Sequence, residues 1–154
     1  MSLDSSFWLD APGATPASAQ ALLLGTGFFE PLDDLQKRKR LSAPGCILTI
    51  AVPLPPQFTL TDAGIAATLN LIFANSDKDD TKSWTLNTMR AVMCLLHAYP
   101  DDALLLYSTG SPALLRKRDD LMLDQRCGLW QPDVEPQVLS MVDVPHRFGV
   151  IPLD

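Results

Sequence analysis

Cysteine and histidine are scarce in this chain, and long apolar runs are missing. The three cysteines, Cys46, Cys94 and Cys127, are scattered along the 154 residues. An odd, ungrouped set predicts reduced thiols in a cytoplasmic protein rather than a disulfide framework. The apolar runs fall far short of the roughly 20 residues that cross a bilayer. The first ten residues hold no basic residue, which a secretory signal requires. We therefore expect a cytoplasmic protein without a membrane partner.

Positive charge is also in short supply. Twelve basic residues face 18 acidic ones, giving a formal net charge of -6, while 47% of the residues are hydrophobic. This balance allows a packed core and argues against a protein whose whole surface binds nucleic acid. Seven of the 12 basic residues lie in two clusters, residues 37–40 and 116–118. If both clusters share one edge of the fold, a polyanion could bind there; acidic neighbours favour solvated charge instead.

The first half of the chain is predicted to be mostly strands. Residues 1–14 are interpreted as an N-terminal arm that is loose at its tip and docks through the rings of Phe7 and Trp8. Thr15-Pro16 begins a short helix over residues 16–24, since proline at the first helical position loses no needed hydrogen bond. Apolar residues alternate over 46–52 and again over 65–73, which predicts two strands paired antiparallel around the intervening loop. A shorter strand is expected within residues 28–40.

The second half changes period. Apolar residues with helical spacing predict a helix over residues 84–99. The continuous apolar run 103–107 suits a buried strand. Ser111-Pro112 is typical of a helix start, and a second helix is expected to run to about Arg126, closed by Gly128. Residues 138–142 and 148–151 are candidate edge strands.

Together these elements predict the α+β class and a single domain over residues 1–154. A strand–helix–strand passage follows the antiparallel strands, and a further helix follows it. The expected architecture is one mixed, mostly antiparallel sheet with the helices packed on one face, in two layers.

A turn between the buried strand and the second predicted helix is the candidate binding site. Open sheets bind ligands beyond the carboxyl ends of strands, and the free N–H groups of a helix start attract anions. The residues of this anion or nucleic-acid site are Ser108, Thr109, Gly110, Ser111, Arg116 and Arg118. The segment lacks the glycine patterns of nucleotide-binding loops, so a plain tight turn with a helix cap is the favoured interpretation and the anion site the alternative.

The long predicted helix carries a polar stripe opposite its apolar one. It consists of Ser83, Asn87, Arg90, Cys94 and His97. Cys94 and His97 are three residues apart, but two ligands do not make a metal site, so no metal and no cofactor is predicted. We interpret the stripe as facing solvent or a partner. No catalytic residue is predicted either: a hydrolase would need His97 or His146 in a pocket within about 3.2 Å of a nucleophile.

About a third of the chain has a familiar order of features. These are an acidic connection from Asp79, a helix ending in Tyr99-Pro100, a short apolar strand, a Ser-Thr-Gly-Ser turn, Arg116-Lys117-Arg118 and a later Trp130. This order resembles groups of small bacterial single-domain proteins known only as domains of unknown function. The resemblance implies antiparallel strands followed by this half, and no activity. The proline-rich loop at 53–56 and the helix from Pro16 depart from it.

Two functions are expected from these observations. The first is a non-enzymatic interaction or regulatory protein, whose exposed edge strands recruit a protein partner or a second copy. The alternative is an anion or nucleic-acid binding module that uses the turn at Ser108–Ser111 and the cluster at Arg116–Arg118.

Overall fold

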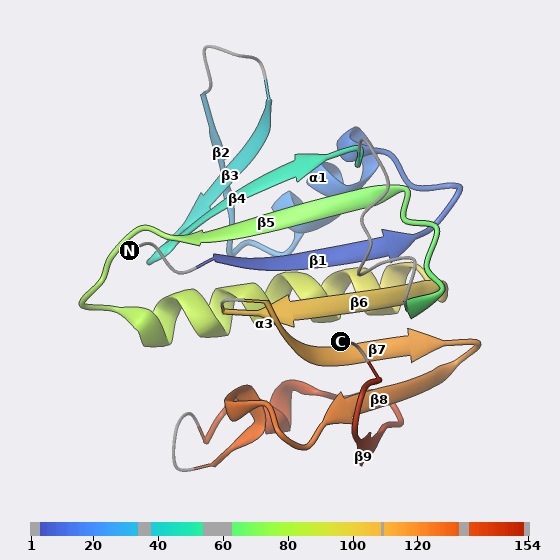
Figure 1. Ribbon diagram of the computed structural model, residues 1–154. Coiled ribbons are helices and arrows are strands. Elements are labelled where there is room, and N and C mark those ends of the chain that lie inside the picture. Colours follow the sequence, from blue (N-terminus) through green and yellow to red (C-terminus); the bar gives the residue numbers. More distant parts are fainter. Residues whose placement is uncertain (1–3, 34–37, 54–62, 109, 133–135, 153–154) are drawn as a thin grey trace.

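The centre of the fold is a nine-stranded mixed sheet with strand order β2-β3-β4-β5-β1-β6-β7-β8-β9 (Figure 1). All neighbouring strands are antiparallel except β8 and β9, which are parallel. The computed structural model describes residues 4–33, 38–53, 63–108, 110–132 and 136–152. The predicted α+β class is confirmed. The elements are β1 (Asp4–Asp10), α1 (Pro16–Gly25), β2 (Glu30–Leu32), β3 (Lys39–Ala43), β4 (Cys46–Ala51), β5 (Leu69–Asn75), α3 (Thr81–Ala98), β6 (Asp102–Tyr107), β7 (Ser111–Lys117), β8 (Asp120–Asp124), η1 (Gly128–Trp130), η2 (Leu139–Met141) and β9 (Arg147–Gly149).

Strand β1 corrects the prediction of a loose N-terminal arm over residues 1–14. It lies in the middle of the sheet, where Phe7 is opposite Leu71 of β5 and Leu105 of β6. Phe7 and Leu9 are fully buried, and Trp8 between them is nearly so. Both faces of this strand are therefore covered, and a strand buried on both faces shows no alternation of polar and apolar residues. The segment was misinterpreted for that reason.

The two strands predicted from alternation are present as β4 and β5. Their antiparallel pairing is confirmed, with Leu48 opposite Phe73. Cys46, Leu48 and Ile50 are buried while the residues between them are partly exposed, as the pattern predicts. Strand β5 begins at Leu69, four residues later than expected. Residues 54–62 of the predicted connecting loop lie outside the described residues.

Helix α3 forms the crossover between β5 and β6. Both strands are antiparallel to β1, which lies between them, so they run parallel to each other. The helix is capped by Asp80, whose Oδ1 accepts from the Ser83 backbone N–H at 3.1 Å. Ser83, the first residue of the predicted polar stripe, therefore lies in the first turn of the helix. Trp84 is fully buried and donates from Nε1 to the Phe73 carbonyl at 3.1 Å, which ties the helix to the sheet.

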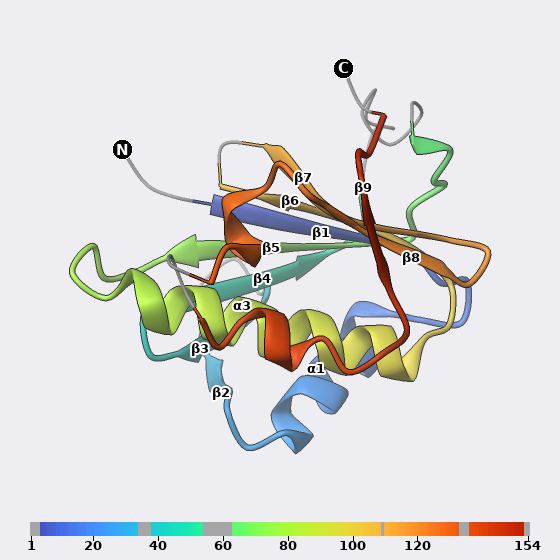
Figure 2. The same cartoon turned by 90° about the horizontal axis from the view of Figure 1, so that it is seen from below.

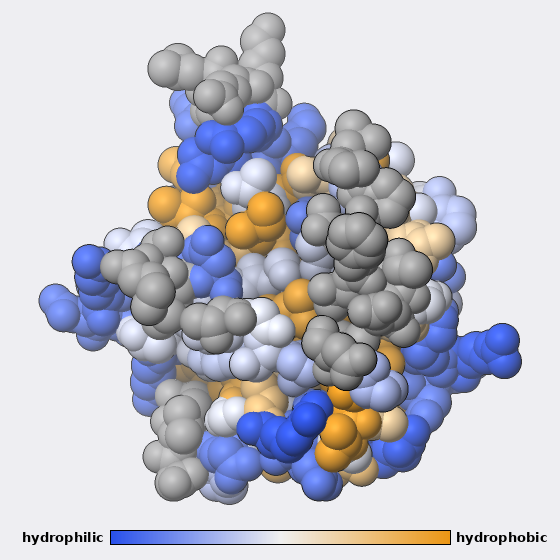
Figure 3. Space-filling view, in the orientation of Figure 1, coloured by the Kyte–Doolittle hydropathy of each residue, from blue (hydrophilic) through white to orange (hydrophobic). Residues whose placement is uncertain are grey.

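Helices α1 and α3 lie on the same side of the sheet (Figure 2). In α1, Thr15 and Ser18 form the capping interaction that the Thr15-Pro16 start predicts. The opposite side of the sheet carries a smaller apolar cluster of Trp8, Ile65, Leu104, Leu115 and Ile151. Elsewhere on that side, hydrophobic patches lie among hydrophilic ones (Figure 3). Neither described helix is long and apolar enough to cross a bilayer.

The tip of the β3–β4 hairpin packs against the start of α3. Gly45 has φ +71°, and an added Cβ would lie 3.0 Å from the Asp80 carbonyl and 3.1 Å from the Trp84 backbone nitrogen. Glycine is therefore required for both backbone conformation and space. The Asn87 side chain donates to the Pro44 carbonyl at 2.9 Å and holds the tip from the helix side.

The helix predicted over residues 111–126 is wrong: this segment is the β7–β8 hairpin. Ala113, Leu114 and Leu115 are all buried, because β7 is an interior strand covered on both faces. Its turn uses Arg118 at φ 51° and Asp119 at φ 70°, without the glycine that usually reveals a tight hairpin.

The C-terminal segment was predicted in part. Residues 138–142 do not form a strand, because η2 (Leu139–Met141) occupies that stretch and lies beside α3 (Figure 2). The edge strand expected at 148–151 is present in part as β9, which begins one residue earlier and ends two residues earlier. Beyond β9, Ile151 is fully buried in the cluster on the side of the sheet away from the helices.

Candidate functional site

Arg116, a residue of the predicted anion site, is used inside the fold. Its side chain is only 7% exposed. Nε donates to the Asp101 carbonyl at 2.7 Å, Nη1 donates to the Leu96 carbonyl at 3.0 Å, and Nη2 donates to the Tyr99 carbonyl. These acceptors lie at and just after the C-terminus of α3, where carbonyl groups lack partners within the helix. Arg116 therefore fastens the end of α3 to β7.

The other residues of the predicted anion site do not gather around Arg116. Ser108 and Gly110 lie between β6 and β7, Ser111 is the first residue of β7, and Thr109 lies outside the described residues. Arg116 is five residues farther along β7, about 16 Å away at the usual strand rise. No helix begins at Ser111, so the helix N-terminus on which the anion hypothesis rested is absent from this segment.

Arg118 and the two basic clusters are equally dispersed. Arg118 lies in the β7–β8 turn, where its backbone N–H donates to Asp102 Oδ1 at 3.0 Å. The neighbouring Lys117 pairs with Asp102 at 2.9 Å. Strands β3 and β7, which carry the described parts of the two clusters, are five strand positions apart in the sheet. That separation is about 24 Å at the usual spacing, so the clusters do not form one surface.

A groove on the helix-bearing side is the candidate site that the structure offers instead. We call it the α3 groove; its volume is about 380 Å³. Its walls come from the end of α1, the outer face of α3, and the segment at η2 (Figure 2). Clefts of this size hold part of a peptide or a small ligand. The lining residues are Thr26, Phe28, Arg90, Met93, Cys94, His97, Ser140, Met141 and Asp143.

Arg90 and Phe28 form one wall of the α3 groove. The Arg90 guanidinium carbon lies 4.3 Å from the centre of the Phe28 ring, and Phe28 is 49% exposed. Arg90 Nη1 donates to Asn87 Oδ1 at 2.8 Å. No carboxylate among the described residues pairs with Arg90. The guanidinium is thus held in place, while most of its donors have no hydrogen-bond partner in the part of the chain that the structure describes.

His97 and Asp143 form the opposite wall. His97 Nε2 and Asp143 Oδ1 are 2.6 Å apart, and both side chains are more than half exposed. The interaction links α3 to the segment that follows η2. The imidazole therefore has a carboxylate as its partner, and none of the described nucleophiles is hydrogen-bonded to it.

Ser140 and Cys94, two potential nucleophiles of the α3 groove, are bonded elsewhere. Ser140 Oγ donates to the Gln137 carbonyl at 2.6 Å. Cys94 Sγ lies 3.9 Å from the Leu22 carbonyl, and partial burial raises the pKa of its thiol. A raised pKa disfavours the thiolate that nucleophilic and metal chemistry need. Within the described residues, no group of three His, Cys, Asp or Glu side chains is arranged so that it could hold a metal ion, in this groove or elsewhere.

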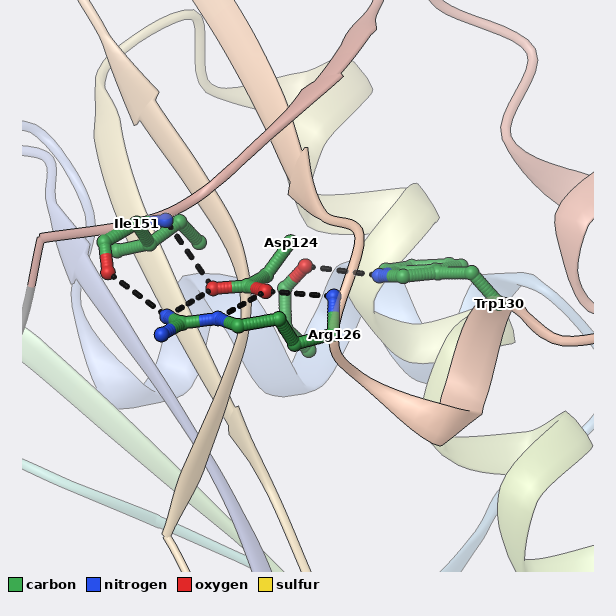
Figure 4. A network of polar contacts seen from close by, with 5 residues as sticks. Asp124, Arg126, Trp130 and Ile151 are labelled. Carbon is green, nitrogen blue, oxygen red and sulfur yellow. Dashed lines mark hydrogen bonds and ion pairs between the residues drawn. The ribbon is translucent and has the colours of Figure 1, made fainter.

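A second polar cluster lies at the end of β8 and contrasts with the α3 groove (Figure 4). Asp124 is 1% exposed and accepts four hydrogen bonds: from the backbone N–H, Nε and Nη2 of Arg126, and from the Ile151 backbone N–H. The Arg126 side-chain hydrogen bonds, followed by the backbone ones and against the effect of burial, lower the pKa of Asp124.

Arg126 Nη2 also donates to the Ile151 carbonyl at 3.2 Å. Nearby, Trp130 Nε1 donates to the Ala113 carbonyl at 2.9 Å. The polar groups of this cluster are hydrogen-bonded to one another, and they hold the C-terminal segment against the sheet. A shallow pocket of about 230 Å³ beside it is lined by Ser111, Pro112, Asp124, Arg126 and Cys127. Because the Arg126 guanidinium is already paired with Asp124, an anion entering this pocket would meet a buried carboxylate.

Only part of the α3 groove could be found from the sequence. Arg90, Cys94 and His97 belong to the predicted polar stripe, and the structure brings them to one surface. Phe28, Met141 and Asp143 were missed, because they come from segments without a regular pattern. Of the remaining stripe residues, Asn87 is buried.

A family model described as SitI3-like matches residues 6–134 of the chain. The match begins in β1 and includes all the strands up to β8, together with both helices. It covers Phe28 and the α3 residues of the groove. No curated protein and no solved structure matches the chain.

Proposed function

The chain belongs to the SitI3-like family, and we propose that this member is a non-enzymatic protein of the bacterial cytoplasm that binds another protein through the α3 groove. The observation that carries the proposal is the exposed Phe28 ring, held by Arg90 at the edge of a cleft. A half-exposed aromatic side chain fixed beside a concave surface is typical of a contact residue.

The apolar part of the α3 groove supports a protein partner. Met93 and Met141 line it together with Phe28. Methionine side chains are flexible and polarizable, and they adapt to the shape of a bound side chain. Burying the exposed half of Phe28 contributes about 1 kcal/mol, if a fully buried Phe contributes about 1.5–3 kcal/mol. Micromolar binding needs about 8 kcal/mol. Phe28 alone is insufficient, and a partner must also use the polar groups.

The bonding within the groove supports binding rather than catalysis. His97 pairs with Asp143, Ser140 donates to a backbone carbonyl, and the pKa of the Cys94 thiol is raised. A nucleophile hydrogen-bonded to a base, the arrangement that acyl transfer requires, is not found among these described side chains. The cytoplasmic location rests on the three cysteines, all free thiols. Anion or nucleic-acid binding is not proposed, because Arg116 is bonded to backbone carbonyls and the basic clusters are far apart.

The test is site-specific photo-cross-linking in the cells that make the protein. The substitution Phe28→p-benzoylphenylalanine places the cross-linker at the groove. The matched control, Ile72→p-benzoylphenylalanine, places it at a similarly exposed position on the opposite side of the sheet. We expect one discrete protein, either another chain or a second copy of this one, to be cross-linked at position 28 and not at position 72. Identical products at both positions, or none at 28, contradict the proposal.

A further inference from the structure

We propose that the segment bound in the α3 groove is acidic: a partner carboxylate binds Arg90 while an apolar side chain beside it packs on Phe28, Met93 and Met141. This inference rests on the proposed function and specifies the chemistry of the partner. Three features of the groove support it: the donors of Arg90 that have no described partner, the placement of the charged side chains, and the apolar lining.

The Arg90 guanidinium is prepared for a carboxylate. Guanidinium has five N–H donors, and one of them is used on Asn87. Asn87 is itself anchored, because its Nδ2 donates to the Pro44 carbonyl at 2.9 Å and its side chain is buried. The Phe28 ring supports one face of the guanidinium. A guanidinium group fixed in this way binds a carboxylate through two parallel hydrogen bonds, with little further loss of side-chain conformational entropy.

The placement of the charged side chains in the α3 groove favours an anion over a cation at Arg90. Asp143, the carboxylate in the described lining, is hydrogen-bonded to His97 at 2.6 Å and forms no ion pair with Arg90. The Arg90 guanidinium is therefore left without a carboxylate partner among the described lining residues. A partner lysine or arginine would be placed beside a like charge, which is unfavourable in a partly desolvated site. The net charge of -6 on the whole chain reduces long-range attraction for an acidic partner, so selection occurs at short range.

The apolar lining requires a hydrophobic group close to that carboxylate. Arg90 and Met93 are about one helical turn apart on α3, and the Phe28 ring lies against the guanidinium. Met141 approaches from η2. A carboxylate that reaches Arg90 thus brings the neighbouring side chain of its own segment over these residues. Aspartate or glutamate adjacent to leucine, methionine or an aromatic residue meets both requirements.

The experiment uses the full chain labelled with [methyl-13C]methionine and three small probes. 4-Phenylbutyrate carries a ring and a carboxylate, 4-phenylbutylamine a ring and a cation, and 4-phenylbutanol a ring and a neutral group. Met93 and Met141 report from the groove. Met89 in the core and Met122 near β9 serve as internal controls. Assignment follows from single Met→Leu variants. Fragments of this size are expected to bind in about the millimolar range.

We expect the shifts of the Met93 and Met141 signals to give a Kd for 4-phenylbutyrate at least about 5-fold lower than for 4-phenylbutanol. 4-Phenylbutylamine should have the highest Kd of the three. Arg90→Gln should make the butyrate bind like the alcohol. The control Lys82→Gln, at an exposed position of the same helix, should keep the preference. An unchanged Met89 signal shows that the variant core is intact.

The opposite results overturn the inference. Equal affinity for the three probes, a preference that survives Arg90→Gln, or shifts at Met122 instead of Met93 and Met141 each exclude a carboxylate site at Arg90. The two proposals fail separately. A specific cross-link at Phe28 without a carboxylate preference leaves the binding function and removes the acidic partner. A carboxylate preference without any cross-link removes the protein partner.

Discussion

Arg90 on α3 and Arg116 on β7, which binds the end of α3, differ in how their hydrogen-bond donors are used. Arg116 donates to three backbone carbonyls at and beyond the end of the helix and is almost completely buried. Arg90 donates to one side chain, lies over a half-exposed ring and pairs with no described carboxylate. Arg116 belongs to a cluster of basic residues in the sequence, and Arg90 does not. Hydrogen-bond donors without a partner among the described residues, and not local charge density, therefore distinguish the binding arginine from the structural one.

The largest effect is expected for Arg116→Met, which keeps the aliphatic stem and removes the donors. The carbonyls of Leu96, Tyr99 and Asp101 lose charge-assisted hydrogen bonds in a partly buried place. We expect the free energy of unfolding to fall by about 3 kcal/mol, measured by urea denaturation. The control Lys82→Gln, on the exposed surface of α3, should stay within about 0.5 kcal/mol. A similar loss in both variants would mean that Arg116 does not fasten the helix.

Asp124→Asn should have the next largest effect, and the effect should depend on pH. The folded-state pKa of Asp124 is lowered, so its carboxylate stabilises the fold at pH values above the unfolded-state pKa, about 3.9. This stability is lost as the pH falls through the lowered folded-state pKa. We expect a deficit of about 2 kcal/mol near neutral pH, because Asp124 is buried and fully bonded.

The measurement for Asp124→Asn is urea denaturation at several pH values. The difference between variant and parent should shrink steadily below about pH 4. Asp79→Asn, at an exposed position, serves as the control and should follow the parent curve. A difference that stays constant down to about pH 2 would show that the carboxylate charge does not matter.

A smaller, stabilising effect is expected in the β7–β8 turn. Arg118 and Asp119 both have positive φ, where most side chains are strained. The double substitution Arg118→Asn with Asp119→Gly supplies the preferred pair for this type of turn, and thermal unfolding should show a gain of about 1 kcal/mol. Arg118→Ala with Asp119→Ala should not give this gain. If both double variants gain equally, the turn backbone is not strained.

Arg90→Gln should have the smallest effect on stability. The contact with Phe28 contributes about 0.5–1 kcal/mol at a partly exposed site, and the Asn87 bond can be replaced by water. Urea denaturation should therefore show a loss below about 1 kcal/mol. A loss as large as that of Arg116→Met would place Arg90 in the structural class and remove the distinction between the two arginines.

The sequence predicted the strands and helices whose apolar residues recur at a regular spacing. In β4 the buried residues follow the alternation; in α3 the spacing predicted the helix, although the polar residues Thr85, Asn87 and Thr88 are buried as well. The apolar run 103–107 was also predicted correctly, as the buried strand β6. Strands β1 and β7 are interior strands of the sheet with both faces covered. Continuous apolar residues are compatible with helix, strand or a docked arm, so their period carried no information. In the β7–β8 hairpin, Ser111-Pro112 also imitated a helix start, and the turn lacks glycine.

The α3 groove was predictable only where it follows a helix. The spacing of Arg90, Cys94 and His97 places them on one face of α3. Phe28 and Asp143 are brought to that face by packing of segments about 60 and 50 residues away in the chain. Nothing local encodes that approach. The unused donors of Arg90 are likewise a property of its surroundings, which a linear pattern does not describe.

The central place of β1 has a consequence for synthesis on the ribosome. Its residues leave the exit tunnel well before those of its two neighbours in the sheet, which begin at Leu69 and Asp102. Until residue 107 has emerged, Phe7 and Leu9 have no complete pair of neighbours, and β2–β5 cannot be joined to β6–β9. Strand β1 therefore lacks one of its neighbours until β6 has emerged. Folding is expected to be completed late, when β6 pairs with β1 and joins the two parts of the sheet.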